Sequence, residues 1–204
     1  MTAFRFDDLR QHSDILRLRT GKPVTIRFIE PGDAEALQAY FRSLSTRSRY
    51  NRFLGAISEL PATQLDQFID VGEADRFSVV AVMNIDGADT IVGETRYAFD
   101  AETDSFEFGL SIDDRWQGLG AGSALLGNLE CRAAAFGAHR LFGDTLRSND
   151  AMIGLARKSG FAFTHLPGDW KLVRFEKHIA AAPQEIPCAS WRLAAQQIEL
   201  HAAL

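Results

Sequence analysis

The chain has 204 residues, of which 46% are hydrophobic and 24% are charged, as is ordinary for one globular domain with short additions at its ends. Its net charge of -5 and its isoelectric point near 5.5 argue against binding to nucleic acid or to an anionic membrane, because both need a basic face. The chain has neither an apolar run of membrane-spanning length nor a signal-peptide pattern, so we expect a cytoplasmic protein. No His and Cys residues have the spacing of metal ligands, and no metal is expected.

The first part of the chain favours one strand followed by helices. Residues 13–19 fit a short strand or a helix, and the choice stays open. Residues 23–29 alternate as a strand does, and apolar residues between 33 and 44 repeat with the spacing of one buried helix face. Further helices are expected at 45–54, which is basic and aromatic, and at 61–69.

The second part favours strands first and strand–helix units afterwards. Strands are expected at 77–83, 91–97 and 105–112, with Asp86-Gly87 as the turn between the first two. A glycine loop and a helix follow. The remaining elements expected are a strand at 139–145, a helix at 149–160, and paired strands at 161–165 and 170–175. This order predicts an α/β fold, in which helices flank a mixed, mostly antiparallel sheet in one domain.

A glycine-rich loop separates the strand 105–112 from the helix that follows it. Gly118, Gly120 and Gly122 alternate with Leu119 and Ala121 directly before that helix. The first turn of a helix leaves backbone N–H groups unpaired and carries partial positive charge, and glycine lets an anion approach the backbone closely. The arrangement predicts a site for a phosphorylated cofactor, although a glycine-rich turn without a ligand gives the same pattern.

The spacing of the glycines excludes two common phosphate sites. A P-loop needs Lys followed by Ser or Thr after its last glycine, and here Ser123-Ala124 follow. The dinucleotide fingerprint G-x-G-x-x-G/A fails at its last position from either possible first glycine. The pattern that fits is Q-x-x-G-x-G, formed by Gln117, Gly120 and Gly122. In this segment the chain resembles the GCN5-related N-acetyltransferases (GNAT), in which the loop holds the pyrophosphate of acetyl-CoA.

A later segment resembles a second motif of the same family. Asn149 opens an expected helix that ends in Lys158-Ser159-Gly160-Phe161. Ser148 or Asn149 can cap the start of this helix, and Gly160 can end it in the left-handed conformation. In the family, the Asn lies near the pantetheine arm of the cofactor, so Asn149 is expected to contact it here.

The opening half carries a narrower resemblance. Residues 25–33 and 41–53 are similar to the catalytic domain of bacterial Pat-type protein lysine acetyltransferases, which modify a lysine of acyl-CoA synthetases. The resemblance implies one N-acetyltransferase domain at 23–178, with splayed central strands. Residues 1–22 are then an N-terminal extension. Residues 179–204 are expected to hold a linker and a possible amphipathic helix from Ser190, through which a homodimer could form.

Acetyl transfer to an amine needs a base, and Glu107 is the candidate. It lies in the strand 105–112, and its neighbours Phe106 and Phe108 face the opposite side. A base that takes the proton of a lysine amine, whose pKa starts near 10.4, is worth about 10²–10⁴-fold in rate. The Pat-type resemblance places its catalytic glutamate at the same position. We expect an apolar setting for Glu107; the alternative is an edge-strand carboxylate in solvent or in a salt bridge.

The resemblance also implies which residues contact the acyl donor, acetyl-CoA. In the family, the splayed strand binds pantetheine through its backbone, and one N–H, here that of Leu110, polarises the thioester oxygen. Backbone rather than side-chain contacts are expected from the loop, and the acidic pair Asp113-Asp114 is expected to face solvent or to help select a cationic substrate. The candidate cofactor-binding residues are Leu110, Ser111, Ile112, Gln117, Gly118, Leu119, Gly120, Ala121, Gly122, Ser123 and Asn149.

One position departs from the pattern of the wider family. Many members have a tyrosine that protonates the leaving thiolate where this chain has Ala156. Pat-type domains also lack this tyrosine, so its absence fits the narrower resemblance. Water, Thr145 or Ser148 could supply the proton instead.

Three functions stay open on the sequence alone. The leading hypothesis is an acetyl-CoA-dependent N-acetyltransferase that modifies a protein lysine. The same chemistry would serve a small amine, such as a polyamine, an amino acid or an aminoglycoside. A non-catalytic acyl-CoA sensor would need the glycine loop but no base. The acceptor site is expected from loops at 45–75 and 164–170, and loop sequence does not identify an acceptor.

Overall fold

The computed structural model describes residues 13–70, 76–100, 102–135, 138–166 and 168–179. The expected linker and the helix from Ser190 lie outside these residues. The strands are β1 (Asp14–Arg17), β2 (Pro23–Phe28), β3 (Arg76–Ile85), β4 (Ala88–Asp100), β5 (Ser105–Ile112), β6 (Arg140–Leu146), β7 (Ala162–His165) and β8 (Leu172–His178). The helices are α2 (Ala34–Ser43), α3 (Thr46–Phe53), α4 (Ala62–Ile69), α5 (Ala121–Ala135) and α6 (Asp150–Lys158), with 3₁₀ turns η1 (Pro31–Asp33) and η3 (Asp114–Trp116).

The strands form one sheet in the order β1-β2-β3-β4-β5-β6-β8-β7. Neighbouring strands are antiparallel except β5 and β6, which are parallel. The turn between β3 and β4 has positive φ at Asp86 (52°) and Gly87 (86°), as a two-residue hairpin turn requires. The undecided segment 13–19 contains the edge strand β1. The predicted α/β fold with a mixed, mostly antiparallel sheet is confirmed.

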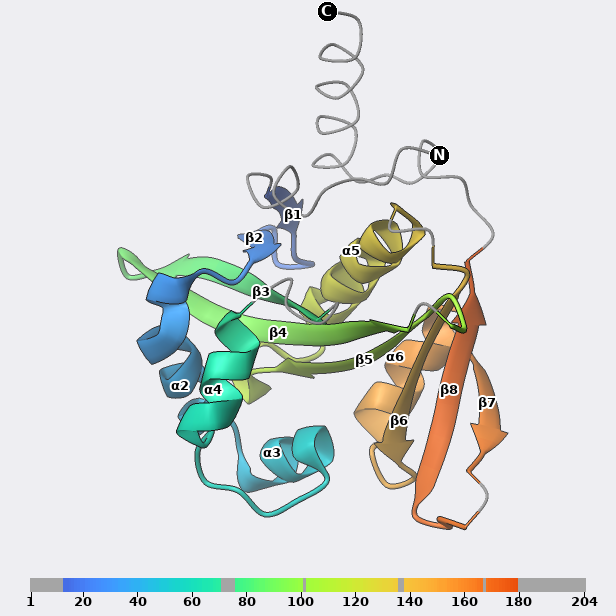
Figure 1. Ribbon diagram of the computed structural model, residues 1–204. Helices are drawn as coiled ribbons and strands as arrows, with labels where there is room; N and C mark the ends of the chain where they lie inside the picture. The colour runs from blue at the N-terminus through green and yellow to red at the C-terminus, as the bar shows by residue number, and fades with distance from the viewer. Residues whose placement is uncertain (1–12, 71–75, 101, 136–137, 167, 180–204) are drawn as a thin grey trace, which may run out of the picture.

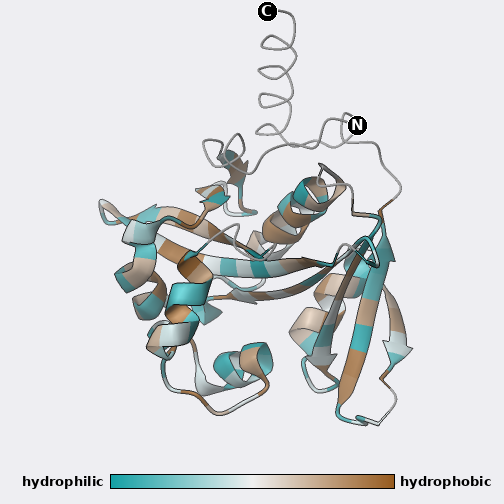
Figure 2. Ribbon diagram, viewed as in Figure 1, coloured by the Kyte–Doolittle hydropathy of each residue, from teal (hydrophilic) through white to brown (hydrophobic). Residues whose placement is uncertain are grey.

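Helices cover both faces of the sheet. In Figure 1, α2 and α4 lie at the lower left of the central strands and α5 lies above them. The front core joins these two helices to β3 and β4 through Leu37, Phe41, Phe68, Val80 and Ile91. The back core joins α5 to the central strands through Leu125, Leu129, Ile26, Ala81 and Phe106. Figure 2 shows the apolar residues gathered along these central strands. Burial on both faces explains why β3 reads as a continuous apolar run rather than an alternating one.

Candidate active site

The splay predicted between the central strands begins after Glu107. The parallel pairing of β5 with β6 consists of Ser105–Arg140, Phe106–Leu141 and Glu107–Phe142. Beyond that point, β5 pairs with β4 alone and β6 pairs with β8 alone among the described strands. The opening therefore exposes one edge of β5 from Phe108 to Ile112, and two cavities lie beside it.

The glycine loop has a backbone that only glycine adopts easily. Gly118 and Gly120 have φ values of 73° and 104°, in the left-handed region that disfavours a side chain. Two contacts hold the loop in place: Gln117 donates from Nε2 to the carbonyl oxygen of Ile112 (3.0 Å), and the carbonyl of Leu119 accepts from the backbone N–H of Arg19 (2.9 Å). Gln117 thus uses its side chain as well as its backbone, and it ties the loop to the end of β5.

A cavity of about 650 Å³, here called the cofactor cavity, lies between this loop, β5, α3 and α6. All the candidate cofactor-binding residues line it except Leu119 and Ala121. Ala121 begins α5 and is 1% exposed, because it packs into the back core. The carbonyl of Leu119 faces Arg19, as described above. These two positions do not line the cavity, and the expectation that their backbone contacts the cofactor stays a prediction.

Asn149 caps α6 as predicted. Its Oδ1 accepts from the backbone N–H of Met152 (3.3 Å), and its Nδ2 donates to Oγ1 of Thr145 (3.0 Å) on β6. Gly160 ends the helix with φ of 81°, in the left-handed conformation that such a helix end favours. Asn149 lines the cofactor cavity, so one residue both fixes the helix start and reaches the site.

Helix α3 contributes more of the cofactor cavity than the sequence indicated. It contributes Arg47, Ser48, Asn51 and Arg52, so this face of the basic helix forms part of the cavity wall. Arg19, which precedes β2, also lines the cavity and was not predicted. The sequence places Arg19 only in the segment 13–19, for which the choice between a strand and a helix stayed open.

The acidic pair before the glycine loop has a structural role. Asp113 is buried, against the expectation that it faces solvent. Burial opposes its ionisation, but hydrogen bonds from Arg115 and Ser43 hold the pKa of Asp113 below its ordinary value. Asp114 is exposed and accepts hydrogen bonds of 2.8 Å from the N–H and Oγ of Ser45 and from Oγ of Ser48. The pair therefore fastens α2 and α3 to the loop.

A buried polar network that the sequence did not predict lies between β4, β5 and α3. Arg52 donates to Glu94 from Nε (2.6 Å) and Nη2 (3.2 Å). Ser111 donates to the same carboxylate (2.6 Å) and lies 2.9 Å from the hydroxyl of Tyr40. Burial opposes the charge on Arg52, but Glu94 holds the pKa of Arg52 above its ordinary value. Burial and then the charge of Glu94 raise the pKa of Tyr40, which keeps its proton.

A second cavity, of about 540 Å³ and here called the acceptor cavity, lies on the α4 side of β4 and β5. Arg52 lines both cavities, so its guanidinium stands where they meet. Glu107 lines the acceptor cavity and is exposed, so the apolar setting expected for it is absent. The segment 45–75 contributes Arg52, Leu54 and Gln67, while no described residue of 164–170 lines the cavity.

The position of the missing tyrosine is part of the core. Ala156 is 0% exposed and packs with the back core. Neither Thr145 nor Ser148, the two side chains considered as acids, lines either cavity.

The described residues contain neither a metal-binding cluster nor a membrane-spanning helix. No group of three or more His, Cys, Asp or Glu side chains there is placed to hold a metal ion. No helix in the described part of the chain has the length and apolar character that a membrane span needs.

Comparisons with known proteins agree with this geometry. Residues 38–161 match the model of the acetyltransferase (GNAT) family. An acetyltransferase of Pseudomonas aeruginosa, PA5475, is 32% identical over 152 residues, which are 74% of this chain and 82% of the relative. Acetyltransferase Pat of Mycolicibacterium smegmatis is 28% identical over 67% of this chain, a match that spans 40% of the relative's own length. The crystal structure of the GNAT domain of S. lividans PAT has a TM-score of 0.74 and 26% identity, and the match covers 81% of this chain and 96% of that domain. The chain belongs to the acetyltransferase (GNAT) family.

Proposed function

We propose that this GNAT-family acetyltransferase transfers the acetyl group of acetyl-CoA to a lysine side chain of a protein, such as an acyl-CoA synthetase. The observation that carries the proposal is the meeting of two cavities at the splay of β5 and β6, with the glycine loop in one and Glu107 in the other. One cavity suits a phosphorylated donor and the other admits an amine, so donor and acceptor can meet at β5. The catalytic domain in this proposal is residues 23–178.

The residues of the cofactor cavity fit acetyl-CoA. Gly118 and Gly120 carry no Cβ atom and have positive φ, and the first turn of α5 offers backbone N–H groups to the pyrophosphate. Arg19 and Lys158 line the same cavity and add positive charge. Leu110, Ser111 and Ile112 on the open edge of β5, with Asn149 at the start of α6, would hold the pantetheine arm. Acetyl-CoA supplies an acetyl group on a thioester.

The chemistry assigns one role to Glu107. It accepts the proton of the lysine ammonium, directly or through water, and leaves a neutral amine. The C–N bond to the acetyl carbon then forms, the C–S bond of the thioester breaks, and the proton that the nitrogen loses in forming the amide passes through water to the leaving thiolate. The backbone N–H of Leu110 would stabilise the carbonyl oxygen as negative charge develops on it.

The likeness to two Pat proteins favours a protein acceptor. Both relatives carry Pat in their names, and one is a GNAT domain that this chain covers almost entirely. The exposed position of Glu107 in an open cavity also suits a lysine that is presented on another protein.

The test measures thiol release from acetyl-CoA with an acyl-CoA synthetase and, in parallel, with a panel of small amines. Mass spectrometry then identifies the modified residue. Turnover with the synthetase on a lysine supports the proposal. Turnover with small amines alone overturns the protein acceptor, and acetyl-CoA binding without turnover overturns the enzyme in favour of a sensor.

The role of Glu107 is tested with Glu107→Gln. We expect kcat/KM to fall by about 10²-fold or more, with unchanged affinity for acetyl-CoA because Glu107 lies outside the cofactor cavity. Glu35→Gln is the matched control, since Glu35 is exposed on α2 and lines neither cavity. Equal activity of the two variants would show that Glu107 is not the base.

A further inference from the structure

The acceptor cavity has one end with positive charge that nothing in the described chain neutralises. Arg76 and Arg96 line it, and neither forms an ion pair with a described carboxylate. Other arginines of the protein are paired in this way, at N–O distances of 2.6–2.8 Å: Arg27, Arg42, Arg52, Arg115, Arg140 and Arg174. The acceptor cavity thus lies beside two cations that form no ion pair with any residue that the structure describes.

The surroundings of Arg96 add to this charge. Its guanidinium lies over the ring of Phe68, 4.7 Å from the centroid. Burial, and then the charges of Arg76 and Arg52, hold the pKa of Arg96 below its ordinary value. The nearby carboxylate of Glu94 is already bound by Arg52 and Ser111. Bringing like charges together is unfavourable, and an anionic ligand would relieve it.

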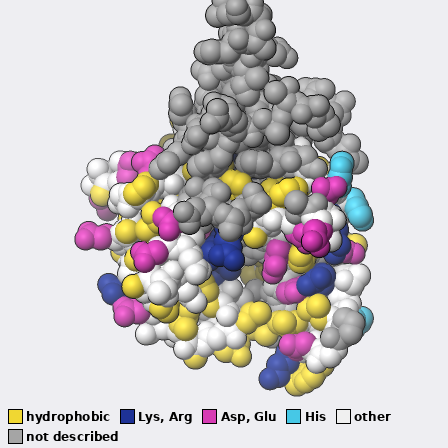
Figure 3. Space-filling view, in the orientation of Figure 1, with side chains coloured by type: hydrophobic (Ala, Val, Ile, Leu, Met, Phe, Trp, Pro, Cys, Tyr) yellow, Lys and Arg dark blue, Asp and Glu magenta, His cyan; other side chains and the backbone are white. Residues whose placement is uncertain are grey.

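The opposite end of the cavity is acidic. Asp144 lines it, but both of its oxygens accept from Arg174 (2.8 Å each), so its charge is compensated. Glu107 has no ion pair with a described residue. Figure 3 shows basic and acidic side chains facing each other near the centre of this side of the molecule. An acceptor with a positive and a negative group would match both ends.

Sheet register fixes the spacing of the two ends. Glu107 is opposite Ala98, and Ala98 is opposite Arg76, so Glu107 and Arg76 lie in one row two strands apart, or about 10 Å between Cα atoms. Arg96 is opposite Gly109 and is therefore a diagonal neighbour of Glu107, at about 7–8 Å. In an extended peptide, side chains two positions apart lie on the same face, about 7 Å apart, which is a distance of this order.

We propose that Arg76 and Arg96 bind a carboxylate of the acceptor, so that the enzyme selects a lysine with an acidic residue two positions away in the sequence. The inference rests on the proposed function and names its substrate class. The lysine amine reaches Glu107, and the Asp or Glu side chain two positions away reaches the two arginines. Repulsion by Glu107 keeps that carboxylate from binding at the wrong end.

The test compares three peptides that differ only in the residues two positions before and two positions after one lysine: aspartate, alanine or arginine. With wild-type protein, we expect kcat/KM to be highest for the aspartate peptide and lowest for the arginine peptide. Arg76→Gln and Arg96→Gln should each raise the KM for the aspartate peptide by about tenfold. The KM for acetyl-CoA should stay unchanged, because neither arginine lines the cofactor cavity.

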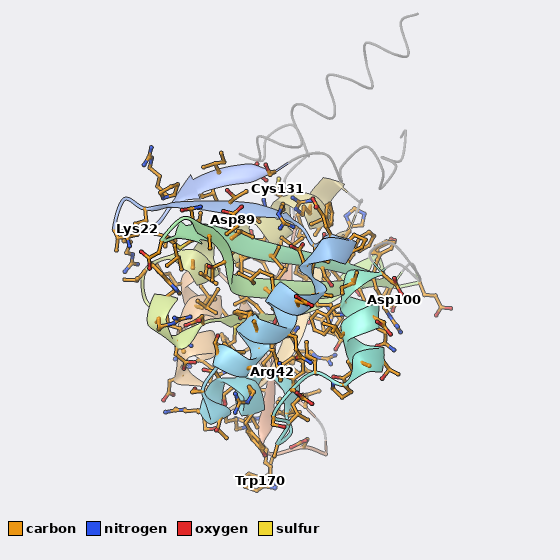
Figure 4. All side chains as sticks on the ribbon, turned by 90° about the vertical axis from the view of Figure 1, so that its left-hand side faces the viewer. Lys22, Arg42, Asp89, Asp100, Cys131 and Trp170 are labelled. Atoms are coloured by element: carbon orange, nitrogen blue, oxygen red, sulfur yellow. The ribbon has the colours of Figure 1, made fainter. Side chains whose placement is uncertain are left out.

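The control variant is Arg42→Gln, which removes the same charge from the outer surface of α2, where Figure 4 labels this residue. Arg42 lines neither cavity, and its exposed pair with Glu59 contributes little to stability. We expect Arg42→Gln to keep the wild-type preference. The double variant Arg76→Glu/Arg96→Glu should favour the arginine peptide instead.

A measurement on wild-type protein covers the case in which these variants fold poorly. Salt screens exposed charges, so raising the ionic strength should raise the KM for the aspartate peptide and leave that for the alanine peptide nearly unchanged. Acetylation of all three peptides with equal kcat/KM overturns the inference and leaves the proposed function standing. The absence of any lysine acetylation, with acetyl-CoA bound, overturns both. Acetylation of free aspartate or glutamate, but of no peptide, would keep the carboxylate site and overturn the protein acceptor.

Discussion

The cofactor cavity and the acceptor cavity are built in different ways. The cofactor cavity depends on backbone conformation, since the positive φ angles of Gly118 and Gly120 give the loop its shape. The acceptor cavity depends on charged side chains from separate strands: Arg76 on β3, Arg96 on β4 and Glu107 on β5. Substitutions that add a Cβ atom should therefore disturb binding in the cofactor cavity most, and substitutions that change a charge should disturb binding in the acceptor cavity most.

The two cavities share one wall. Arg52 lines both, and Glu94 holds it with two hydrogen bonds. Gly109 on β5 lies directly beneath it, because a Cβ atom built on Gly109 would overlap Nη1 of Arg52 and lie 2.8 Å from its Cζ. At this wall a charged pair crosses β5 at a position where an added Cβ atom would displace the Arg52 guanidinium. Changes to this wall give the largest effects.

The first prediction concerns the charge of the wall. Glu94→Gln leaves Arg52 buried without a counter-ion and weakens the hydrogen bond from Ser111, so we expect the free energy of unfolding to fall by about 3 kcal/mol. Urea denaturation measures this. Glu59→Gln is the matched control, because it breaks an ion pair in which the side chain of Glu59 is 56% exposed and that of Arg42 is 60% exposed. It should lower the free energy of unfolding by at most about 0.5 kcal/mol. Equal losses in the two variants would mean that the wall does not depend on this pair.

The second prediction concerns the glycine of the wall. Gly109→Ala forces Arg52 to move toward one of the cavities, so we expect a loss of about 1–2 kcal/mol in stability and about tenfold in kcat/KM. Gly127→Ala is the control, because a Cβ atom at Gly127 meets nothing within 4 Å, and in mid-helix it should stabilise by about 0.5–1 kcal/mol. Unfolding curves and steady-state kinetics on both variants decide the matter. Unchanged kinetics in Gly109→Ala would show that the position of Arg52 does not affect catalysis.

The same contrast explains what the sequence could reveal. The glycine loop and the cap at Asn149 were predictable because each is local: Gln117, Gly120 and Gly122 follow one another at fixed spacing. The alternation of β5 also placed Glu107 on the face opposite Phe106 and Phe108, and the structure puts it in the acceptor cavity. Both predictions depend on short-range geometry, which a sequence carries directly.

The rest depends on sheet register, which local sequence does not carry. Arg76, Arg96 and Glu94 come together through the pairing of β3 with β4 and of β4 with β5. In the sequence, Glu94 and Arg96 look like the polar positions of an ordinary strand. The setting of Glu107 was missed for the same reason, since its neighbours belong to other strands. Asp113 was expected in solvent because its partner Ser43 is 70 positions away in the sequence.

The last prediction has the smallest expected effect. It uses the pH dependence of stability to test Asp114, which lines the cofactor cavity and not the acceptor cavity. Asp114 holds Ser45 and Ser48 at the start of α3, and although burial opposes its ionisation, these hydrogen bonds hold the pKa of Asp114 below its ordinary value.

A carboxylate with a lowered pKa in the folded state stabilises the protein at pH values above its unfolded pKa, near 3.9, and this stabilisation is lost as the pH falls through the folded pKa. Asp114→Asn should therefore lower the free energy of unfolding by about 1 kcal/mol at pH 7, and the difference from wild type should shrink as the pH falls below about 3.9 and through the folded pKa of Asp114. At neutral pH, α3 should also hold acetyl-CoA less firmly, so the KM for acetyl-CoA rises a few-fold while the KM for the acceptor changes less, because Asp114 lines only the cofactor cavity. A stability difference that persists unchanged at pH 2.5 would show that the carboxylate charge is not what anchors the helix.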